Sequence, residues 1–132
     1  MRARLHAAAF ALALPTLACG FWPQPCDEAR PARQRELDEY RAALRAGIDE
    51  WNERYRQSPS ARARGAHSAA AQTVSRLERD LRAADEIERL WQAGDEEGAR
   101  DLVRDLSNSF SAIQPDADEL RDADLAVKNC TE

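Results

Sequence analysis

The sequence has few of the residues that build β-sheets. Runs of Val, Ile, Thr and Tyr are absent, aromatic residues make up 6%, and there are only five glycines and six prolines in 132 residues. Charged residues make up 33%, and the strong helix formers Ala, Leu, Arg and Glu are abundant. This composition argues against a sheet protein and predicts an all-α fold, in which long solvated helices surround one core.

Basic residues are scarce in the second half of the chain. From Ser68 onward, acidic residues outnumber basic ones about two to one, and Lys128 is the only lysine. The arginines are spread along the predicted helix faces. Because no basic face is apparent that could displace counterions from phosphates, we do not expect nucleic acid as a partner.

Side chains that support catalysis or metal binding are also rare. After the first eighteen residues, His67 is the only histidine, and no cysteine or second histidine is spaced to complete a metal site or a nucleophilic triad. Phosphate-binding glycine loops and the EF-hand spacing of oxygen ligands are missing. The sequence therefore predicts no catalytic residue, no metal and no cofactor, and we do not expect an enzyme.

The first eighteen residues have the pattern of a secretory signal peptide. Arg2 and Arg4 precede an apolar run of about fourteen residues, which is shorter than the roughly 20 residues of a membrane-spanning helix. Pro15 disfavours the alternative, an N-terminal core helix, because it would break that helix. We expect residues 1–18 to be removed and the protein to be exported.

The end of this leader resembles the lipobox of bacterial lipoproteins. Thr16-Leu17-Ala18-Cys19-Gly20 has a leucine, small residues and a cysteine, although the leucine lies one position nearer the cysteine than the family prefers. The resemblance implies that Cys19 becomes the lipidated first residue. Gly20 in place of aspartate implies sorting to the outer membrane, on its periplasmic face. Cleavage after Ala18 or Gly20 by an ordinary signal peptidase is the alternative, and it leaves a soluble periplasmic or secreted protein.

The three cysteines are consistent with this resemblance. An exported chain with an odd number of cysteines requires an explanation for the unpaired one, and lipidation of Cys19 supplies it. Cys26 and Cys130 then remain, and an oxidising compartment allows them to form a disulfide. If Cys19 is not lipidated, the pairing stays open.

Apolar residues at spacings of three and four predict four helices after a tether over residues 19–30. The first apolar stripe consists of Leu37, Tyr40, Leu44, Ile48, Trp51 and Tyr55, the second of Ala70, Val74, Leu77, Leu81, Ala84, Ile87 and Trp91, and the third of Ala99, Leu102, Val103, Leu106, Phe110 and Ile113. The predicted helices span about 31–57, 68–93, 95–113 and 117–129, with a turn over 61–68 between the first two.

Local signals indicate where these helices begin and end. Pro31 suits a first helical position, Ser68 and Asp95 suit N-caps, and Gly94 suits a left-handed helix stop. Asp116, with a glutamate three residues later, resembles a capping box that opens the fourth helix.

The first two stripes predict an antiparallel helical hairpin. Two shorter helices pack against it and complete an antiparallel bundle. Apolar residues pair at the same level when their numbers sum to 124 or 125, as Ile48 does with Leu77. Four alternating helices place both chain ends on one side. Because the later helices are shorter, we expect the segment before Pro31 to bend back so that Cys26 reaches Cys130.

The leading functional hypothesis is a membrane-tethered, non-enzymatic helical module that binds a protein or an envelope component through its acidic C-terminal half. Trp91 is the candidate aromatic because the hairpin register leaves it without an opposite apolar partner. Asp95, Glu96 and Glu97 complete the candidate surface. An inhibitor or immunity protein against an exported toxin or hydrolase is the alternative, since an acidic surface suits a basic enzyme. A third hypothesis, an enzyme that uses carboxylates alone, requires a deep pocket with two facing acids.

Overall fold

The structure, a computed structural model, describes residues 23–132. Within this range it contains five α-helices, one 3₁₀-helix and no β-strand, apart from an isolated bridge between Pro25 and Thr131. The helices are α2 (Cys26–Gln57), α3 (Pro59–Arg64), η1 (Gly65–His67), α4 (Ala69–Gln92), α5 (Glu96–Asn108) and α6 (Gln114–Lys128).

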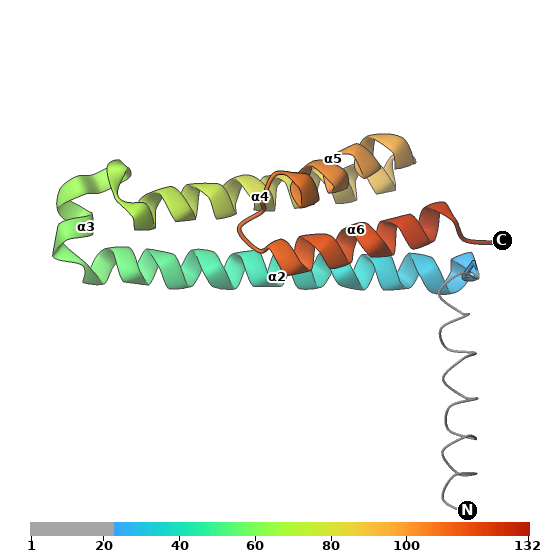
Figure 1. The fold of residues 1–132 in the computed structure, drawn as a ribbon, viewed down its shortest axis with the longest axis horizontal. Helices are drawn as coiled ribbons and strands as arrows, with labels where there is room; N and C mark the ends of the chain where they lie inside the picture. The colour runs from blue at the N-terminus through green and yellow to red at the C-terminus, as the bar shows by residue number, and fades with distance from the viewer. Residues whose placement is uncertain (1–22) are drawn as a thin grey trace, which may run out of the picture.

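The helices form an antiparallel bundle, which confirms the predicted all-α fold. The two long helices α2 and α4 lie side by side as a hairpin, and α3 and η1 close its far end (Figure 1). The shorter α5 and α6 pack along only the half of the hairpin that is nearer the chain ends (Figure 1). The other half of the hairpin therefore extends beyond the four-helix core.

Several predicted helix ends are confirmed by their capping contacts. Ser68 Oγ accepts a hydrogen bond from Ala71 N at the start of α4, and an Asp95 carboxylate oxygen accepts one from Gly98 N at the start of α5. Gly94 has a φ of 80°, the left-handed conformation that glycine adopts most easily. These residues fix the tight connection between α4 and α5.

The predicted start of the first helix is wrong by five residues. Helix α2 begins at Cys26, and Pro31 lies inside it, so Cys26 to Arg30 belong to the helix and not to a tether. Pro25 is the N-cap residue and its side chain forms no capping hydrogen bond. A proline this close to a helix start removes only one backbone hydrogen bond, which the first turns of a long, packed helix tolerate.

The connection between α5 and α6 also differs from the prediction. Helix α5 ends at Asn108 and α6 begins at Gln114, with Ile113 as its N-cap, so Asp116 lies in the first turn and does not cap. Phe110 was assigned to the third apolar stripe, but it is 87% exposed and has a left-handed φ of 54°. The Gln114 amide donates a hydrogen bond to Ser107 O, a carbonyl at the last turn of α5, and so stabilises the early helix end.

The core and the hairpin register agree with the sequence pattern. The largest fully buried apolar side chains are Leu37, Tyr40, Leu44, Leu77, Ile87, Val103 and Leu120. Gly47, next to Ile48, packs directly on Leu77, because a Cβ atom at Gly47 would lie 3.3 Å from Leu77 Cδ1. The predicted pairing of Ile48 with Leu77 is therefore confirmed to within one residue.

The chain ends meet at a disulfide between Cys26 and Cys130, as predicted, with a Cα–Cα distance of 5.0 Å. The expected backward bend before Pro31 is wrong, because the helix α2 continues through Pro31 to Cys26. Instead, the segment that follows α6 brings Cys130 to Cys26. Cys26 N donates to Thr131 O and Thr131 N donates to Gln24 O, both at 2.9 Å, so the two segments run alongside each other.

Candidate functional site

Trp91, the aromatic residue of the predicted partner surface, is half-buried in the bundle. The Arg33 guanidinium lies over its ring, with Cζ 4.1 Å from the ring centroid. Arg33 and Trp91 occupy the same level of the hairpin, so the residue opposite Trp91 is a cation, which attracts the face of the ring. The indole Nε1 is buried and forms no hydrogen bond with the described residues.

Arg33 is itself the centre of a partly buried ionic cluster, which we define as Arg33, Glu96, Arg100 and Asp124. Arg33 donates hydrogen bonds to Glu96 at 2.7 and 3.2 Å and to Asp124 at 3.0 Å. Arg100 Nε lies 3.1 Å from Asp124 Oδ2, close enough for an ion pair. The side chains of Arg33 and Asp124 are 6% and 1% exposed, so each depends on its partners for charge compensation.

The other predicted surface residues differ in their surroundings. The hydrogen bond from Arg33 holds the pKa of Glu96 below its usual value, and Asp95 caps α5. Glu97 is exposed. Three of the four residues therefore contribute to the fold, and the prediction that this surface binds a partner stays a prediction.

A second buried polar network joins three elements at the middle of the hairpin. Ser111 Oγ donates to Asp80 Oδ2 at 2.9 Å, and the Tyr40 hydroxyl donates to Ser111 Oγ at 2.6 Å. Ala112 N also donates to Asp80 Oδ2, at 3.2 Å. Burial raises the pKa of Tyr40 to about 12, so its hydroxyl keeps its proton at neutral pH. The network attaches the α5–α6 loop to α2 and α4.

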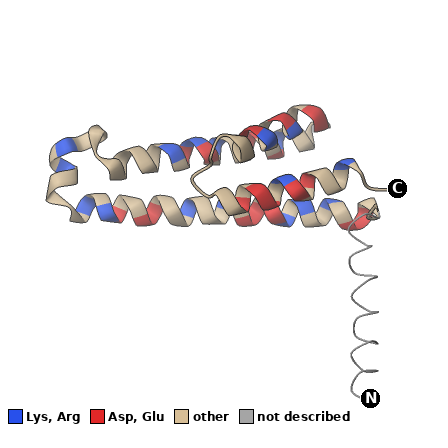
Figure 2. Ribbon diagram, viewed as in Figure 1, with Lys and Arg blue, Asp and Glu red and all other residues tan. Residues whose placement is uncertain are grey.

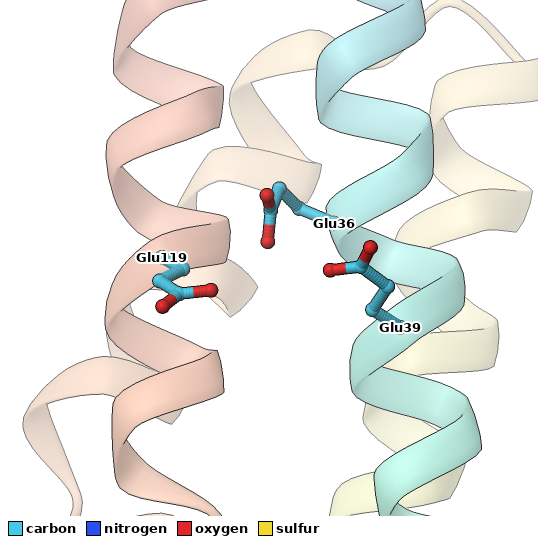
Figure 3. Close-up of side chains that lie close together, drawn as sticks. All are labelled: Glu36, Glu39 and Glu119. Atoms are coloured by element: carbon cyan, nitrogen blue, oxygen red, sulfur yellow. The ribbon is translucent and has the colours of Figure 1, made fainter.

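Three carboxylates gather between α2 and α6: Glu36, Glu39 and Glu119 (Figure 3). One oxygen atom from each lies within 4.8 Å of the others. Partial burial, followed by the charges of Glu39 and Glu119, raises the pKa of Glu36. Carboxylate oxygens are the ligands that divalent cations prefer, so these side chains could hold one. Since Glu39 and Glu119 are exposed, the group does not form the deep pocket that a carboxylate enzyme requires.

A shallow hollow of about 240 Å³ lies between α5 and α6, in the half of the chain where acidic residues outnumber basic ones. Basic side chains nevertheless dominate its wall, and Val103 and the 41% exposed Leu125 supply its apolar part. The residues lining it are Arg100, Val103, Arg104, Arg121, Asp124, Leu125 and Lys128. Arg104 and Arg121 form ion pairs with neighbouring aspartates, so little of this positive charge is left for a ligand.

The remaining predicted site residues are the cysteines. Cys26 and Cys130 form the disulfide, which indicates an oxidising, exported location. Cys19 lies outside the described residues. Among residues 23–132, no helix combines the length and the apolar character needed to cross a membrane.

Comparison with known proteins adds no functional assignment, since no protein-family model, curated protein or solved structure matches the chain.

Sequence reasoning did not anticipate the buried charges. Arg33, Asp80 and Asp124 each lie at helical spacing within an apolar stripe, and Asp124 falls between Leu120 and Val127. A charge on an apolar face signals a buried ion pair, and that signal was present in the sequence. The sequence could not predict which charges pair with each other, because the pairing depends on how α5 and α6 pack against α2.

Proposed function

We propose that the protein is an exported lipoprotein, anchored through Cys19 to the periplasmic face of the outer membrane, whose helical bundle binds a partner and catalyses no reaction. The observation that supports it best is the Cys26–Cys130 disulfide. It accounts for two of three cysteines and leaves Cys19, in a lipobox-like context, as the residue available for lipid.

The proposed binding role is supported by the kind of polar groups that the bundle holds. Its buried charged and hydroxyl groups bond to one another and connect helices, as in Arg33 with Asp124 and Tyr40 with Ser111. Groups used in this way stabilise one arrangement of the core and leave the outer surface for recognition.

Labelling with radioactive palmitate tests the anchor in cells that export the full chain. We expect label on the wild-type protein and none on Cys19→Ser, with both proteins exported and folded. Cys26→Ser is a matched control, because it removes a cysteine seven residues away and should keep the label. Label retained in Cys19→Ser, or absent from the wild type, contradicts the anchor.

A further inference from the structure

A stretch of chain at the far end of the hairpin has arginines and no acidic residue of its own, although Glu50 and Glu53 of α2 adjoin it and pair with two of these arginines. We call residues 54–77 the basic tip; they form the last turn of α2, α3, η1 and the first turns of α4. Between Glu53 and Glu78 the chain has no carboxylate and five arginines: Arg54, Arg56, Arg62, Arg64 and Arg76. Residues 83–132 hold fourteen carboxylates and five basic residues. Figure 2 shows the separation, with arginines around α3 and most acidic residues in the other half of the bundle.

Much of the charge on the basic tip is not neutralised within the molecule. Arg54 forms an ion pair with Glu50, and Arg56 forms one with Glu53. Arg62, Arg64 and Arg76 are exposed and form no ion pair with the described residues. Their guanidinium groups are available for carboxylates of another molecule, which they can bind in a bidentate manner.

Apolar side chains lie beside this charge. Trp51 and Tyr55 continue the core stripe of α2 but are only half-buried, because α5 and α6 do not extend along this part of the hairpin (Figure 1). The Arg54 guanidinium lies over Trp51, with Cζ 4.4 Å from the ring centroid. Trp, Tyr and Arg are the residue types that contribute most to binding energy in protein interfaces.

The basic tip is also far from the chain ends. Helix α2 has 32 residues, so at 1.5 Å per residue its ends are about 48 Å apart, with the disulfide at one end and the tip at the other. An anchor at the N-terminus would leave the tip free to meet a partner away from the membrane surface.

We propose that the basic tip docks an acidic protein, with Trp51 and Tyr55 as apolar anchors and with Arg62, Arg64 and Arg76 contacting its carboxylates. The inference rests on the binding part of the proposed function and not on the anchor. Charge complementarity selects an acidic partner, and the adjoining aromatic side chains favour a protein over a purely charged polymer. A second copy that meets the first tip to tip is disfavoured, because this arrangement would place equal charges together.

Photocrosslinking in the natively exported full chain tests this surface. A benzophenone amino acid replaces Ala63 in the basic tip or, as a matched control, Ala93 at the opposite end; both alanines are exposed. We expect a protein adduct from position 63 and none from 93. The double variant Arg62→Glu with Arg64→Glu should reduce the adduct about tenfold or more, whereas Arg35→Glu with Arg89→Glu should not.

The captured protein is then purified and its affinity for the mature protein is measured at two salt concentrations. A partner with an acidic surface, bound about tenfold more weakly by Arg62→Glu with Arg64→Glu and more weakly at high salt, supports the proposal. Any of four results overturns it: no adduct at position 63, an adduct at position 93 only, capture of a second copy of the chain, or an affinity that charge reversal does not change. Because affinity is measured in solution, failure of palmitate labelling would not affect this result. An unchanged urea midpoint shows that the variants fold.

Discussion

Arg33 and Asp124 place opposite charges inside the bundle, at positions where the surrounding stripes are apolar. Each compensates the charge of the other, and both side chains are almost fully buried. Removal of one partner from such a pair leaves the other charge buried, and this costs more than the pair itself contributes.

Asp124→Ala should therefore lower the free energy of unfolding by about 3 kcal/mol. The loss leaves Arg33 with Glu96 as its remaining partner and removes the carboxylate beside Arg100. Urea unfolding measures the change. Asp101→Ala, which removes the exposed partner of Arg104, is the control and should change stability by at most about 0.5 kcal/mol. Equal stabilities of the two variants would show that the cluster does not hold α6 on α2.

Substitution of Glu36, unlike that of Asp124, should raise the free energy of unfolding at neutral pH. The raised pKa of Glu36 means that the folded chain binds the carboxyl proton more tightly than the unfolded chain does. The contribution of this tighter proton binding to stability is complete below the ordinary pKa of 4.5 and is lost as the pH rises through the raised pKa. Glu36→Gln should thus stabilise the protein by about 0.5 kcal/mol near pH 7, a small value because solvent screens these charges.

The advantage of Glu36→Gln should disappear near pH 3, where the carboxyl group is protonated in both proteins. Glu53→Gln is the matched control, because the hydrogen bond from Arg56 lowers the pKa of Glu53. Its contribution is present above the ordinary pKa and is lost as the pH falls. Urea unfolding at both pH values should show Glu53→Gln as destabilising at neutral pH only. A stability of Glu36→Gln that does not depend on pH contradicts the account of the three carboxylates.

At the scale of elements, the interiors of the helices could be predicted and several of their ends could not. Apolar residues at helical spacing located the four helices α2, α4, α5 and α6, because burial of one face determines that pattern. Ser68 and Asp95 marked helix starts because their side chains cap. Pro25 and Ile113 precede helices without any capping side chain, so the starts of α2 and α6 lacked the signal that marks α4 and α5.

The early end of α5 depends on contacts that are distant in sequence. The Ser111 hydroxyl and the Ala112 amide bond to Asp80 in α4, and this attachment draws the chain out of the helix before the apolar stripe ends. Phe110 is left in solvent with a positive φ. No reading of the third stripe alone could have shown this.

Phe110→Asn should raise the free energy of unfolding by about 0.5–1 kcal/mol. Asparagine tolerates the left-handed conformation better than phenylalanine, and an 87% exposed ring loses little packing. Thermal and urea unfolding measure the gain. Leu125→Asn is the control, since Leu125 is also exposed but lies within α6, where asparagine should not stabilise. A loss of stability in Phe110→Asn would mean that the ring packs on the bundle.

At the scale of the whole molecule, two features organise the protein: the disulfide that joins its ends and the separation of charge along its length. The sequence predicted the disulfide through the cysteine count, and the loop it closes is worth about 4–5 kcal/mol in the chain-entropy model. The sequence analysis missed the basic segment between Glu53 and Glu78. It compared the net charge of the two halves of the chain, and such a comparison does not reveal a short basic segment. The hairpin places that segment at one end.

The central claim is that two cysteines bond to each other and the third carries lipid. The intact mass of the mature protein, purified from membranes without reductant, tests it most directly. We predict a chain that begins at Cys19, carries acyl groups on that residue, and lacks the two hydrogens that a Cys26–Cys130 disulfide removes. A mass for a chain that begins elsewhere without lipid, or a chain with two free thiols, would contradict the account.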